Sequence, residues 1–488
     1  MGFYAAATTL LASAHESAGK AKKLFYADDG SGGGKLIDIL DWWRFLQLNG
    51  PALGFFPDAS KTWLVVKPEF EQKARELFPD VNITTEGKKY LGSYIGTDTG
   101  AGKFVEEMVE KWSKDIEALA EIAATEPQLA YAAYTFGTSH RWESVCRTTP
   151  NISSALKPLD KLIDERLIPA LFGGKCYHEL RKLFSLPARL GGLGLRVPSE
   201  EAALEYEYSL NINKQLTDAI FNQESSFEVD PKIQSEKINE TKKQKASRYE
   251  TLQAELKSEL TKDLWKVIEL SAEKGASMWL TTIPIVEHGF RLNKQQFLDA
   301  LCMRYDLNLN DVPRKCYCGE NYSINHCLTC RNGGFVIMRH NAVRDSILDM
   351  VNETCKDVKL EPALLPLSGE TFSNKKANVS DCARSDISAL GLWQPMYRAF
   401  LDIRVFNPLA QTNWQKQIPD MYVYQEGLKK DEYNERILEV EKASFTPLVF
   451  SCSGGASIET TKFLKKLAKL LSEKKNEPYS ATMSYIRI

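Results

Sequence analysis

The sequence predicts an α+β protein built from several domains, and three observations lead to this prediction. Short strand-like runs separated by glycine turns fill residues 1–97, helical periodicity dominates 103–305, and strand signals return among helices after residue 310. A length of 488 residues corresponds to roughly three domains. The composition shifts suggest four segments: 1–100, 101–305, 306–345 and a C-terminal α/β segment, 346–488.

The first segment carries alternating strand and helix signals. The runs LFYA and TWLVVK favour strands, and KKYLGSYIG predicts another short strand. The stretch IDILDWWRFLQLNG has apolar residues at helical spacing and ends at Gly50, a residue typical of helix C termini. GPALGFFPDAS has the composition of a turn-rich loop.

The second segment is predicted to be helical throughout. Three stretches repeat apolar residues every three to four positions: KFVEEMVEKWSKDIEALAEIA, SALKPLDKLIDERLIPALF and YETLQAELKSELTKDLWKVIEL. The glycine- and proline-marked LPARLGGLGLRVP, residues 186–198, predicts a loop. Residues 223–250 are charged and fit either a solvated helix or a flexible linker, and we favour the helix. Trp112 and Trp142 are expected in the core.

Overall charge and hydropathy exclude two classes of protein. The net charge is −2 and the pI is about 6.4, so nucleic-acid binding would have to use local basic patches. No run approaches the ~18 apolar residues that span a bilayer. The start of the chain lacks the basic region of a signal peptide and fits a helix of a domain that begins before Met1. We expect an intracellular protein without a membrane partner, located in the nucleus.

Four of the ten cysteines gather within fifteen residues, which indicates a metal site in a reducing compartment. Cys316, Cys318, His326 and Cys330 follow the pattern C-x-C-x7-H-x3-C, and thiolate with imidazole is the ligand set of structural Zn²⁺. Cys327 could replace Cys330 or simply pack. Without metal, the group would be a reduced cysteine cluster. Basic residues beside it suit phosphate contact, although His340 could equally serve its own helix: Arg331, Arg339, His340 and Arg344.

A pair of adjacent carboxylates near the start suggests a second kind of metal chemistry. Asp28 and Asp29 follow the strand-like LFYA and precede a glycine cluster, so they would lie at a turn. Two divalent ions held by hard oxygen ligands such as these, Mg²⁺ above all, activate the attacking oxygen and stabilise the leaving oxygen in nucleotidyl transfer. The alternative is an exposed turn without a metal.

Acidic residues recur in the last segment beside a lysine. Asp402 and Arg404 are two apart in the strand-like FLDIRVF and share a face, and Asp386 lies in an extended stretch sixteen residues earlier. Glu361 ends a helix-like stretch before Pro362. Lys429 lies near the start of the predicted helix YQEGLKKDEYNERILEVE. Carboxylates that hold Mg²⁺ and a lysine that neutralises developing charge can hydrolyse phosphodiesters. Caps, salt bridges and a solvated helix face are the alternatives.

The order of these motifs resembles a known family. YADD, GFFPDASKTWL and YLGSYIG resemble the catalytic hairpin, the following segment and the primer grip of a reverse transcriptase palm. The cysteine cluster is then followed by RHNAVRD, VKLEP, SDI, FLDIRV and KKDEY. This order is similar to the C-terminal part of non-LTR retrotransposon proteins, which carry a zinc knuckle and a restriction-enzyme-like endonuclease behind the reverse transcriptase.

The resemblance implies a role for each segment and for named residues. Segment 1–100 would be a partial palm, 101–305 the helical thumb and connection, 306–345 the zinc knuckle and 346–488 the endonuclease. Lys61 would approach the incoming triphosphate. Glu361, Asp386 and Asp402 would be the acidic members of the nuclease and Lys429 its lysine. The partners would be the element transcript and the target DNA.

Three departures from the family pattern restrict these expectations. The earlier palm aspartate and the fingers have no room before Lys22, so polymerase activity is expected to be incomplete in this chain. Ser385 stands where a proline is usual, and Arg404 stands where many related nucleases have the lysine, with Lys430 as a further substitute for Lys429. The leading expectation is a DNA-nicking fragment of a retroelement protein. The alternatives are a catalytically dead zinc-knuckle protein that binds nucleic acid and an inert relic.

Overall fold

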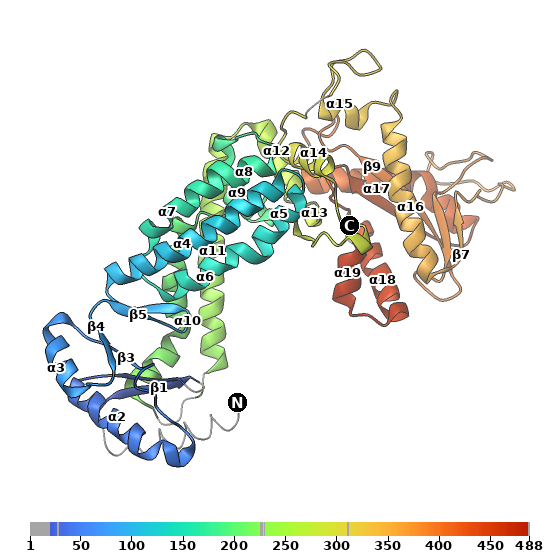
Figure 1. Ribbon diagram of the computed structural model, residues 1–488. Coiled ribbons are helices and arrows are strands. Elements are labelled where there is room, and N and C mark those ends of the chain that lie inside the picture. Colours follow the sequence, from blue (N-terminus) through green and yellow to red (C-terminus); the bar gives the residue numbers. More distant parts are fainter. Residues whose placement is uncertain (1–19, 27–28, 225–227, 229, 310–311, 487–488) are drawn as a thin grey trace. The chain divides into compact units, whose positions relative to one another are not determined.

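The computed structural model describes residues 20–26, 29–224, 228, 230–309 and 312–486, and it combines helices with small sheets (Figure 1). This bears out the α+β class. The chain divides into two compact units. The first comprises the described residues up to Ala120 together with Ala133–Ile168 and Arg196–Gln253, and the second comprises Glu121–Ala132, Pro169–Leu195 and the residues from Ala254 onward.

The first unit begins with an antiparallel hairpin of β1 (Lys22–Tyr26) and β2 (Asp29–Gly33), which pack on helix α2 (Leu36–Asn49). Gly32 is required there, because a Cβ at this position would lie 2.4 Å from the Trp42 ring. Helix α2 confirms the helix predicted for this stretch, with Gly50 as its C-cap. Gln223 accepts a hydrogen bond from the backbone N–H of Lys23 and donates one to its carbonyl, which satisfies the outer edge of β1.

Two further strand pairs follow. β3 (Trp63–Val65) is parallel to β4 (Asn82–Thr84), with α3 (Glu71–Leu77) between them in sequence. The stretch KKYLGSYIG is not one strand but a hairpin of β5 (Gly87–Tyr90) and β6 (Ser93–Gly96). The single-strand prediction was wrong because Leu91 and Gly92 adopt left-handed φ values of 46° and 81°, which reverse the chain.

Helices dominate from Asp98 to Arg304, as predicted. They are α4 (Asp98–Ala123), α5 (Pro127–Ala133), α6 (Ser139–Thr148), α7 (Ser153–Leu162), α8 (Ile168–Leu171), α9 (Arg181–Ser185), α10 (Pro198–Asn222), α11 (Pro231–Glu259), α12 (Lys262–Ser271), α13 (Met278–Thr281) and α14 (Lys294–Arg304). Single 3₁₀ or π turns lie at Pro51–Leu53, Pro68–Phe70, Tyr134–Thr138, Ile163–Leu167, His178–Leu180, Ala188–Leu190 and Val286–His288.

The tryptophans, the helix break at residue 260 and the charged segment of this helical region can each be compared with the prediction. Trp112 and Trp142 are buried, and their rings meet at 6.0 Å in an edge-to-face contact, so both are core residues. The stretch predicted as one helix across residue 260 is broken, because the side chain of Thr261 caps a new helix by accepting from Leu264 N–H. Residues 231–250 belong to a largely exposed helix, which favours the solvated-helix interpretation over a linker.

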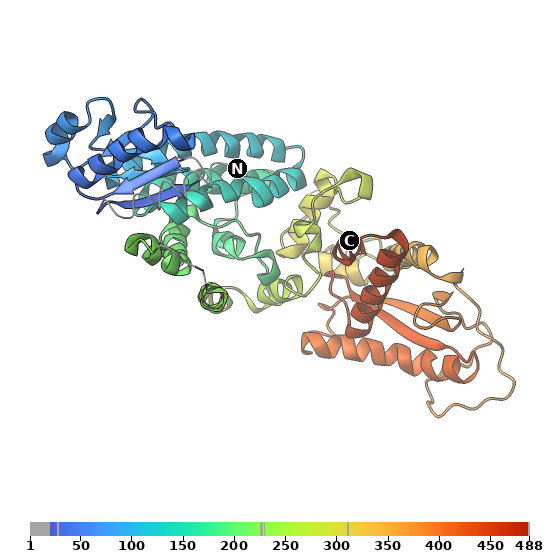
Figure 2. The same cartoon turned by 90° about the horizontal axis from the view of Figure 1, so that it is seen from below.

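In the second unit, a four-stranded sheet with order β10-β9-β8-β7 lies between two helical layers (Figure 2). Its strands are β7 (Lys356–Leu360), β8 (Ile387–Leu390), β9 (Arg398–Phe406) and β10 (Ser444–Ser451). β8 is antiparallel to both of its neighbours, β7 and β9, and β10 runs parallel to β9. The helices of this region are α15 (Ile324–Thr329), α16 (Phe335–Thr354), α17 (Ile418–Glu439), α18 (Ile458–Lys475) and α19 (Tyr479–Ile486).

The alternation of side chains along β9 decides which helix covers which face of the sheet. Ala399, Leu401 and Ile403 pack in the core that also contains residues of α16 and α18. Phe400 and Phe406 pack on the opposite face with residues of α17. Asp402 lies between Phe400 and Phe406 in this alternation, so it belongs to the α17 face.

The long connection between β7 and β8 is held by one buried cation. Arg436 of α17 is fully buried and donates hydrogen bonds to the backbone carbonyls of Leu365, Asn378 and Ser380 at 2.7–3.0 Å. These carbonyls therefore have charged partners, which fixes the connection against α17.

None of the described helices is both long enough and apolar enough to cross a membrane.

Candidate functional site

Three of the predicted acidic residues lie in one row, formed by the ends of β7 and β8 and by the middle of β9. Ile387 pairs with Leu401 and Ser388 with Phe400, so one further step of the same register sets Asp386 opposite Asp402. Leu360 pairs with Ile387, and Ala363 with Arg384, so the same count sets Glu361 opposite Asp386. Directly opposite residues of antiparallel strands are close neighbours. The row Glu361–Asp386–Asp402, here called the acidic row, therefore combines the residue after β7 and the residue before β8 with Asp402 of β9.

Asp402 is the buried end of the acidic row. Only 4% of the residue is exposed, and Nζ of Lys429 lies 2.6 Å from its Oδ2. That oxygen accepts no hydrogen bond of normal geometry, so the contact is an ion pair rather than a directed hydrogen bond. Burial raises the pKa of Asp402 to about 6, the Lys429 charge opposes this shift, and the Asp386 charge adds to it. Burial therefore outweighs the Lys429 charge at this carboxylate.

Asp386 lies where β8 and β9 part. Its Oδ2 accepts a hydrogen bond of 2.6 Å from the backbone N–H of Ile403, and Ser385 Oγ donates to the carbonyl of Leu401. These side chains thus replace ladder bonds beyond the end of β8. Oδ1 of Asp386 lies 3.2 Å from Nε2 of His340 on α16. The carboxylate of Asp386 is therefore held by Ile403 of β9 on one side and by His340 of α16 on the other.

Glu361 ends a strand and not a helix, which corrects the sequence prediction. It follows β7 directly and has a φ of 45°, a left-handed value that is uncommon for a residue with a side chain. Its N–H donates to the carbonyl of Asp386 at 2.8 Å. Its Oε1 pairs with Arg344 of α16, and its side chain is 48% exposed. Pro362 was the misleading signal, because proline ends strands as well as helices.

The two adjacent lysines of α17, Lys429 and Lys430, contact different residues. Lys429 is 17% exposed and contacts Asp402, whereas Lys430 pairs with Glu459 at 3.3 Å. Of the two lysines, Lys429 is therefore the one that contacts Asp402, and Lys430 pairs elsewhere. Arg404 lies two residues beyond Asp402 on the same strand and so on the same face.

Three residues of this site have contacts that the sequence did not indicate. His340 and Arg344 were expected to suit phosphate contact, with a role in its own helix as the alternative for His340. In the structure they contact Asp386 and Glu361 from α16, and their spacing of four was the available signal. Gln425 is buried one helical turn before Lys429, and its side-chain oxygen accepts no hydrogen bond from any described residue. It adds a polar group to the helix face that carries Lys429.

The acidic row does not form a closed metal cage. Within the described ranges, three or more cysteine, histidine or carboxylate ligand atoms lie within 4.8 Å of one another only at Cys316, Cys318, His326 and Cys330. Mg²⁺, however, is commonly bound by one or two carboxylates, with waters and substrate phosphates completing the octahedron.

The cysteine cluster has the geometry that a tetrahedral ion requires. Sγ of Cys316 lies 3.8 Å from Sγ of Cys330, and Sγ of Cys318 lies 3.2 Å from Nε2 of His326. A tetrahedron with Zn–S bonds of about 2.3 Å has sulfur–sulfur edges of about 3.8 Å. The turn at Gly319 (φ 91°) and the helix α15 bring the four ligands together. This cluster could hold a metal ion such as zinc.

Cys327 does not belong to the cluster. It is on α15 and lines a neighbouring pocket with Tyr322, so of the two alternatives it packs rather than replacing Cys330. All ten cysteines are free.

The predicted polymerase residues are only partly described. Asp28 lies outside the described residues. Asp29 pairs with Tyr26 as the last pair of the β1–β2 hairpin and is exposed, in agreement with a position at a hairpin tip. The side chain of Lys61 is 85% exposed in the turn before β3, where it pairs with Asp58 at 3.6 Å. No contact between Asp29 and Lys61 is seen among the described residues.

No model of a known protein family matches the chain, and no characterised protein matches its sequence.

Proposed function

We propose that the second unit is a nuclease that nicks DNA by divalent-metal-dependent hydrolysis of phosphodiester bonds. The observation that carries the proposal is the acidic row with Lys429 against its buried end. We also propose that the chain is a fragment of a retroelement reverse transcriptase and endonuclease, acting on the element transcript and target DNA, with the polymerase incomplete in this chain.

Asp386 and Asp402 are the residues that would hold a magnesium ion, since the Asp386 charge is close enough to raise the pKa of Asp402. Asp402 has an oxygen without a directed hydrogen bond in a buried position, and burial has already raised its pKa to about 6. A cation there would stabilise the ionised form. Each oxygen of Asp386 has one protein contact, and a carboxylate oxygen can accept further partners. When bound, Mg²⁺ supplies Lewis acidity and activates a water for attack on phosphorus.

The remaining side chains supply positioning and charge. Lys429 lies against Asp402 and can neutralise the charge that develops on the phosphate oxygens. His340 and Arg344 hold Asp386 and Glu361 in place from α16. Glu361 keeps a half-exposed carboxylate that can orient a water at the open end of the row. Arg404 offers a permanently charged group to a phosphate, but cannot transfer protons near neutral pH.

The other parts of the proposal have narrower support. The Cys316, Cys318, His326 and Cys330 cluster is proposed as a zinc knuckle that helps to bind nucleic acid. The β1–β2 hairpin is proposed as part of a reverse transcriptase palm, with Asp28 and Asp29 at its tip as magnesium ligands and Lys61 as the lysine near a triphosphate.

The test is a nicking assay on supercoiled plasmid with the zinc-loaded full-length chain. We expect open-circle product with Mg²⁺ and none with Ca²⁺ or without a divalent ion, while a gel-shift assay shows DNA binding in all three conditions. Binding without nicking would support the catalytically dead nucleic-acid-binding protein instead. Neither binding nor nicking would support the inert relic.

A further inference from the structure

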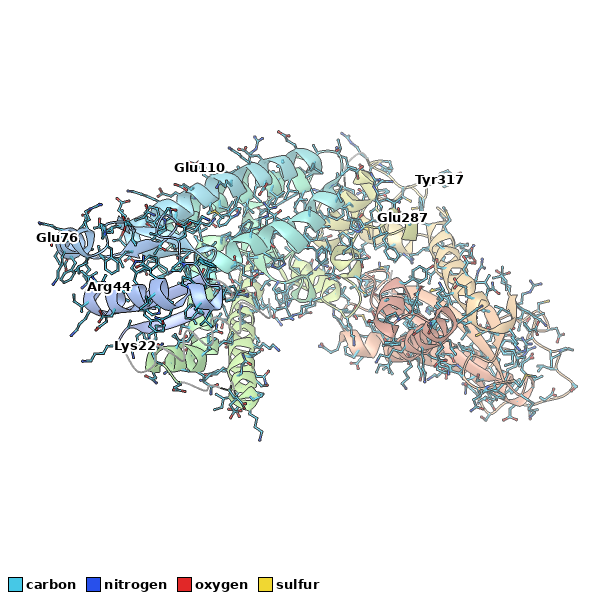
Figure 3. All side chains as sticks on the ribbon, turned by 60° about the horizontal axis from the view of Figure 1, so that its bottom comes forward. Lys22, Arg44, Glu76, Glu110, Glu287 and Tyr317 are labelled. Carbon is cyan, nitrogen blue, oxygen red and sulfur yellow. The ribbon has the colours of Figure 1, made fainter. Side chains whose placement is uncertain are left out.

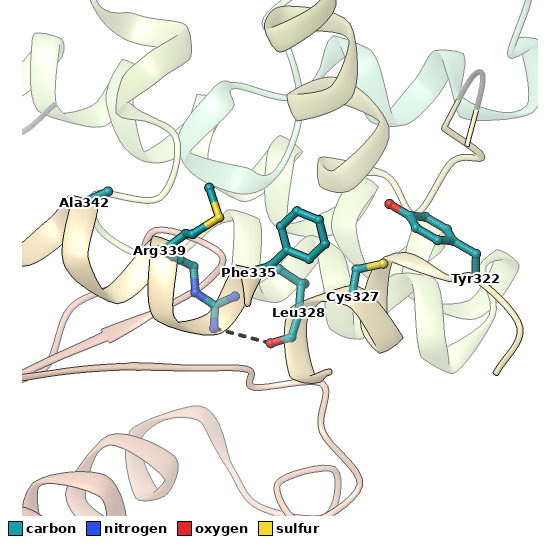
Figure 4. A pocket seen from close by; sticks show the side chains of 7 residues that line it. Tyr322, Cys327, Leu328, Phe335, Arg339 and Ala342 are labelled. Atoms are coloured by element: carbon teal, nitrogen blue, oxygen red, sulfur yellow. Dashed lines mark hydrogen bonds between the residues drawn. The ribbon is translucent and has the colours of Figure 1, made fainter. Parts of the chain in front are cut away.

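A pocket lies beside the cysteine cluster, between α15 and the first two turns of α16 (Figure 4). Its volume is about 440 Å³, and it is lined by Tyr322, Cys327, Leu328, Phe335, Met338, Arg339 and Ala342. The rings of Phe335 and Tyr322 face the same hollow, with the Cys327 sulfur between them. Phe335 is 56% exposed and Met338 is 65% exposed, so the pocket is open to a ligand.

The chemistry of the lining is mixed and favours a flat heteroaromatic ligand. Two aromatic rings and a thioether offer faces for stacking. Arg339 lines the pocket, and its Nη2 donates to the Leu328 carbonyl at 3.3 Å. A guanidinium carries five N–H donors, so those not bound to Leu328 can donate to the ring nitrogens and carbonyl oxygens of a nucleobase, which an aliphatic side chain from a protein partner does not offer.

The charge around the pocket is complementary to a polyanion. Residues 312–344 contain five lysines or arginines and one glutamate, in a chain whose net charge is −2. None of the ion pairs among the described residues involves Arg314, Lys315 or Arg331. Tyr317, between the first two cysteines, is 94% exposed (Figure 3). This surface therefore offers free positive charge and an exposed ring beside the pocket.

One continuous helix links the pocket to the acidic row. Phe335, Met338 and Arg339 of α16 line the pocket, and His340 and Arg344 of the same helix contact Asp386 and Glu361. Five residues of helix, from Arg339 to Arg344, rise about 7.5 Å. That distance corresponds to about two nucleotide steps at 3.4 Å each.

We propose that this pocket binds one unpaired base of the DNA strand, a few nucleotides from the phosphodiester placed at the acidic row. The inference rests on the proposed function in that both make DNA the ligand. Stacking on the ring of Phe335 or Tyr322 would hold the base, and the Arg339 guanidinium in the pocket wall would donate to its edge. The pocket would thus select sites at which a base is unpaired or easily extruded.

The test is fluorescence anisotropy with the zinc-loaded full-length chain and a short single-stranded DNA, in buffer without magnesium so that cleavage cannot contribute. We expect Phe335→Ala to weaken binding about tenfold and Phe335→Trp to preserve it. Ile337→Ala is the matched control, because Ile337 is 63% exposed on the same helix but does not line the pocket. Its affinity should stay within about twofold of that of the unaltered chain.

A series of DNAs, each with one abasic position at a different place, locates the bound base. The unaltered chain should bind one member of the series more weakly than the others, and Phe335→Ala should bind all members equally. Equal DNA affinities of Phe335→Ala and Ile337→Ala, with matching thermal melts, would overturn the proposal. It would also be overturned if Phe335→Ala weakened the binding of single-stranded RNA of the same sequence but not the binding of the DNA. Because binding is measured without magnesium, a chain that fails to nick plasmid but shows the Phe335 dependence would refute the nuclease and retain the pocket.

Discussion

Nζ of Lys429 lies 2.6 Å from Oδ2 of Asp402, and both side chains are at least four-fifths buried. The lysine comes from α17 and the aspartate from the central strand β9, so the pair fixes the helix against the sheet at the acidic row. Removing one member of a buried ion pair destabilises the folded state, because the other charge stays buried without compensation.

Replacing Lys429 with alanine should therefore destabilise the protein by about 3 kcal/mol at pH 8, because Asp402 would remain ionised and buried without its partner. At pH 5 the loss of stability should be smaller. Asp402 has a pKa of about 6 in the folded protein, and this pKa rises further without Lys429. At pH 5 the carboxylate of the variant is therefore protonated and neutral, and no unpaired charge is buried. Denaturant unfolding at the two pH values measures both effects.

Lys430→Ala is the matched control for this experiment. Lys430 is the next residue on α17, but its pair with Glu459 is 41% and 33% exposed, and such pairs contribute below about 1 kcal/mol. Equal losses for the two variants at pH 8 would contradict the assignment of a buried ion pair to Lys429.

The cysteine cluster predicts one zinc ion per chain that depends on Cys318 but not on Cys327. Cys318→Ser removes one of four ligands and should lower both the zinc content and the melting temperature. Cys327→Ser changes a neighbouring residue of the same segment that lies outside the ligand set and should keep the zinc. Mass spectrometry of metal content measures the difference. Unchanged zinc in Cys318→Ser would refute the ligand set.

Glu273 predicts a distinct pH dependence of stability. Burial raises the pKa of Glu273 to about 7, although Tyr422 opposes this by donating a hydrogen bond of 3.1 Å to its carboxylate. Between pH 4.5 and pH 7 the folded state holds a proton that the unfolded state has lost, so the free energy of unfolding falls as the pH rises through this window. Glu273→Gln should flatten this slope and stabilise the protein above pH 7 by about 1–3 kcal/mol. Unfolding curves with an unchanged slope would show that Glu273 is ionised in the folded state.

Local patterns were sufficient to predict much of this fold and site. Strand β1, the helices after Asp98 and strands β9 and β10 follow from apolar runs and hydrophobic periodicity, whereas the hairpin partner β2 was expected only from the family resemblance. The spacing of Cys316, Cys318, His326 and Cys330 predicted their gathering, because the ligands lie on one short segment. Lys429 and Asp402 were assigned to one site from the family resemblance, and the structure brings the two side chains together.

Other features depend on contacts that no local pattern encodes. The element ending at Glu361 was mistaken for a helix because its strand character comes from pairing with β8, which is distant in sequence. The hairpin at Leu91 was missed because its turn relies on a left-handed leucine. The roles of His340 and Arg344 emerge only when α16 packs against the strand ends.

The most direct test of the central claim compares magnesium-dependent plasmid nicking by the unaltered chain with that by Asp402→Ala and Asp420→Ala. Asp420 is an exposed carboxylate in the first turn of α17 and provides the matched control. We predict that Asp402→Ala lowers the nicking rate at least a hundredfold while its DNA binding persists, and that Asp420→Ala nicks normally. Nicking by Asp402→Ala at the rate of the unaltered chain would contradict the assignment of the acidic row as the catalytic centre.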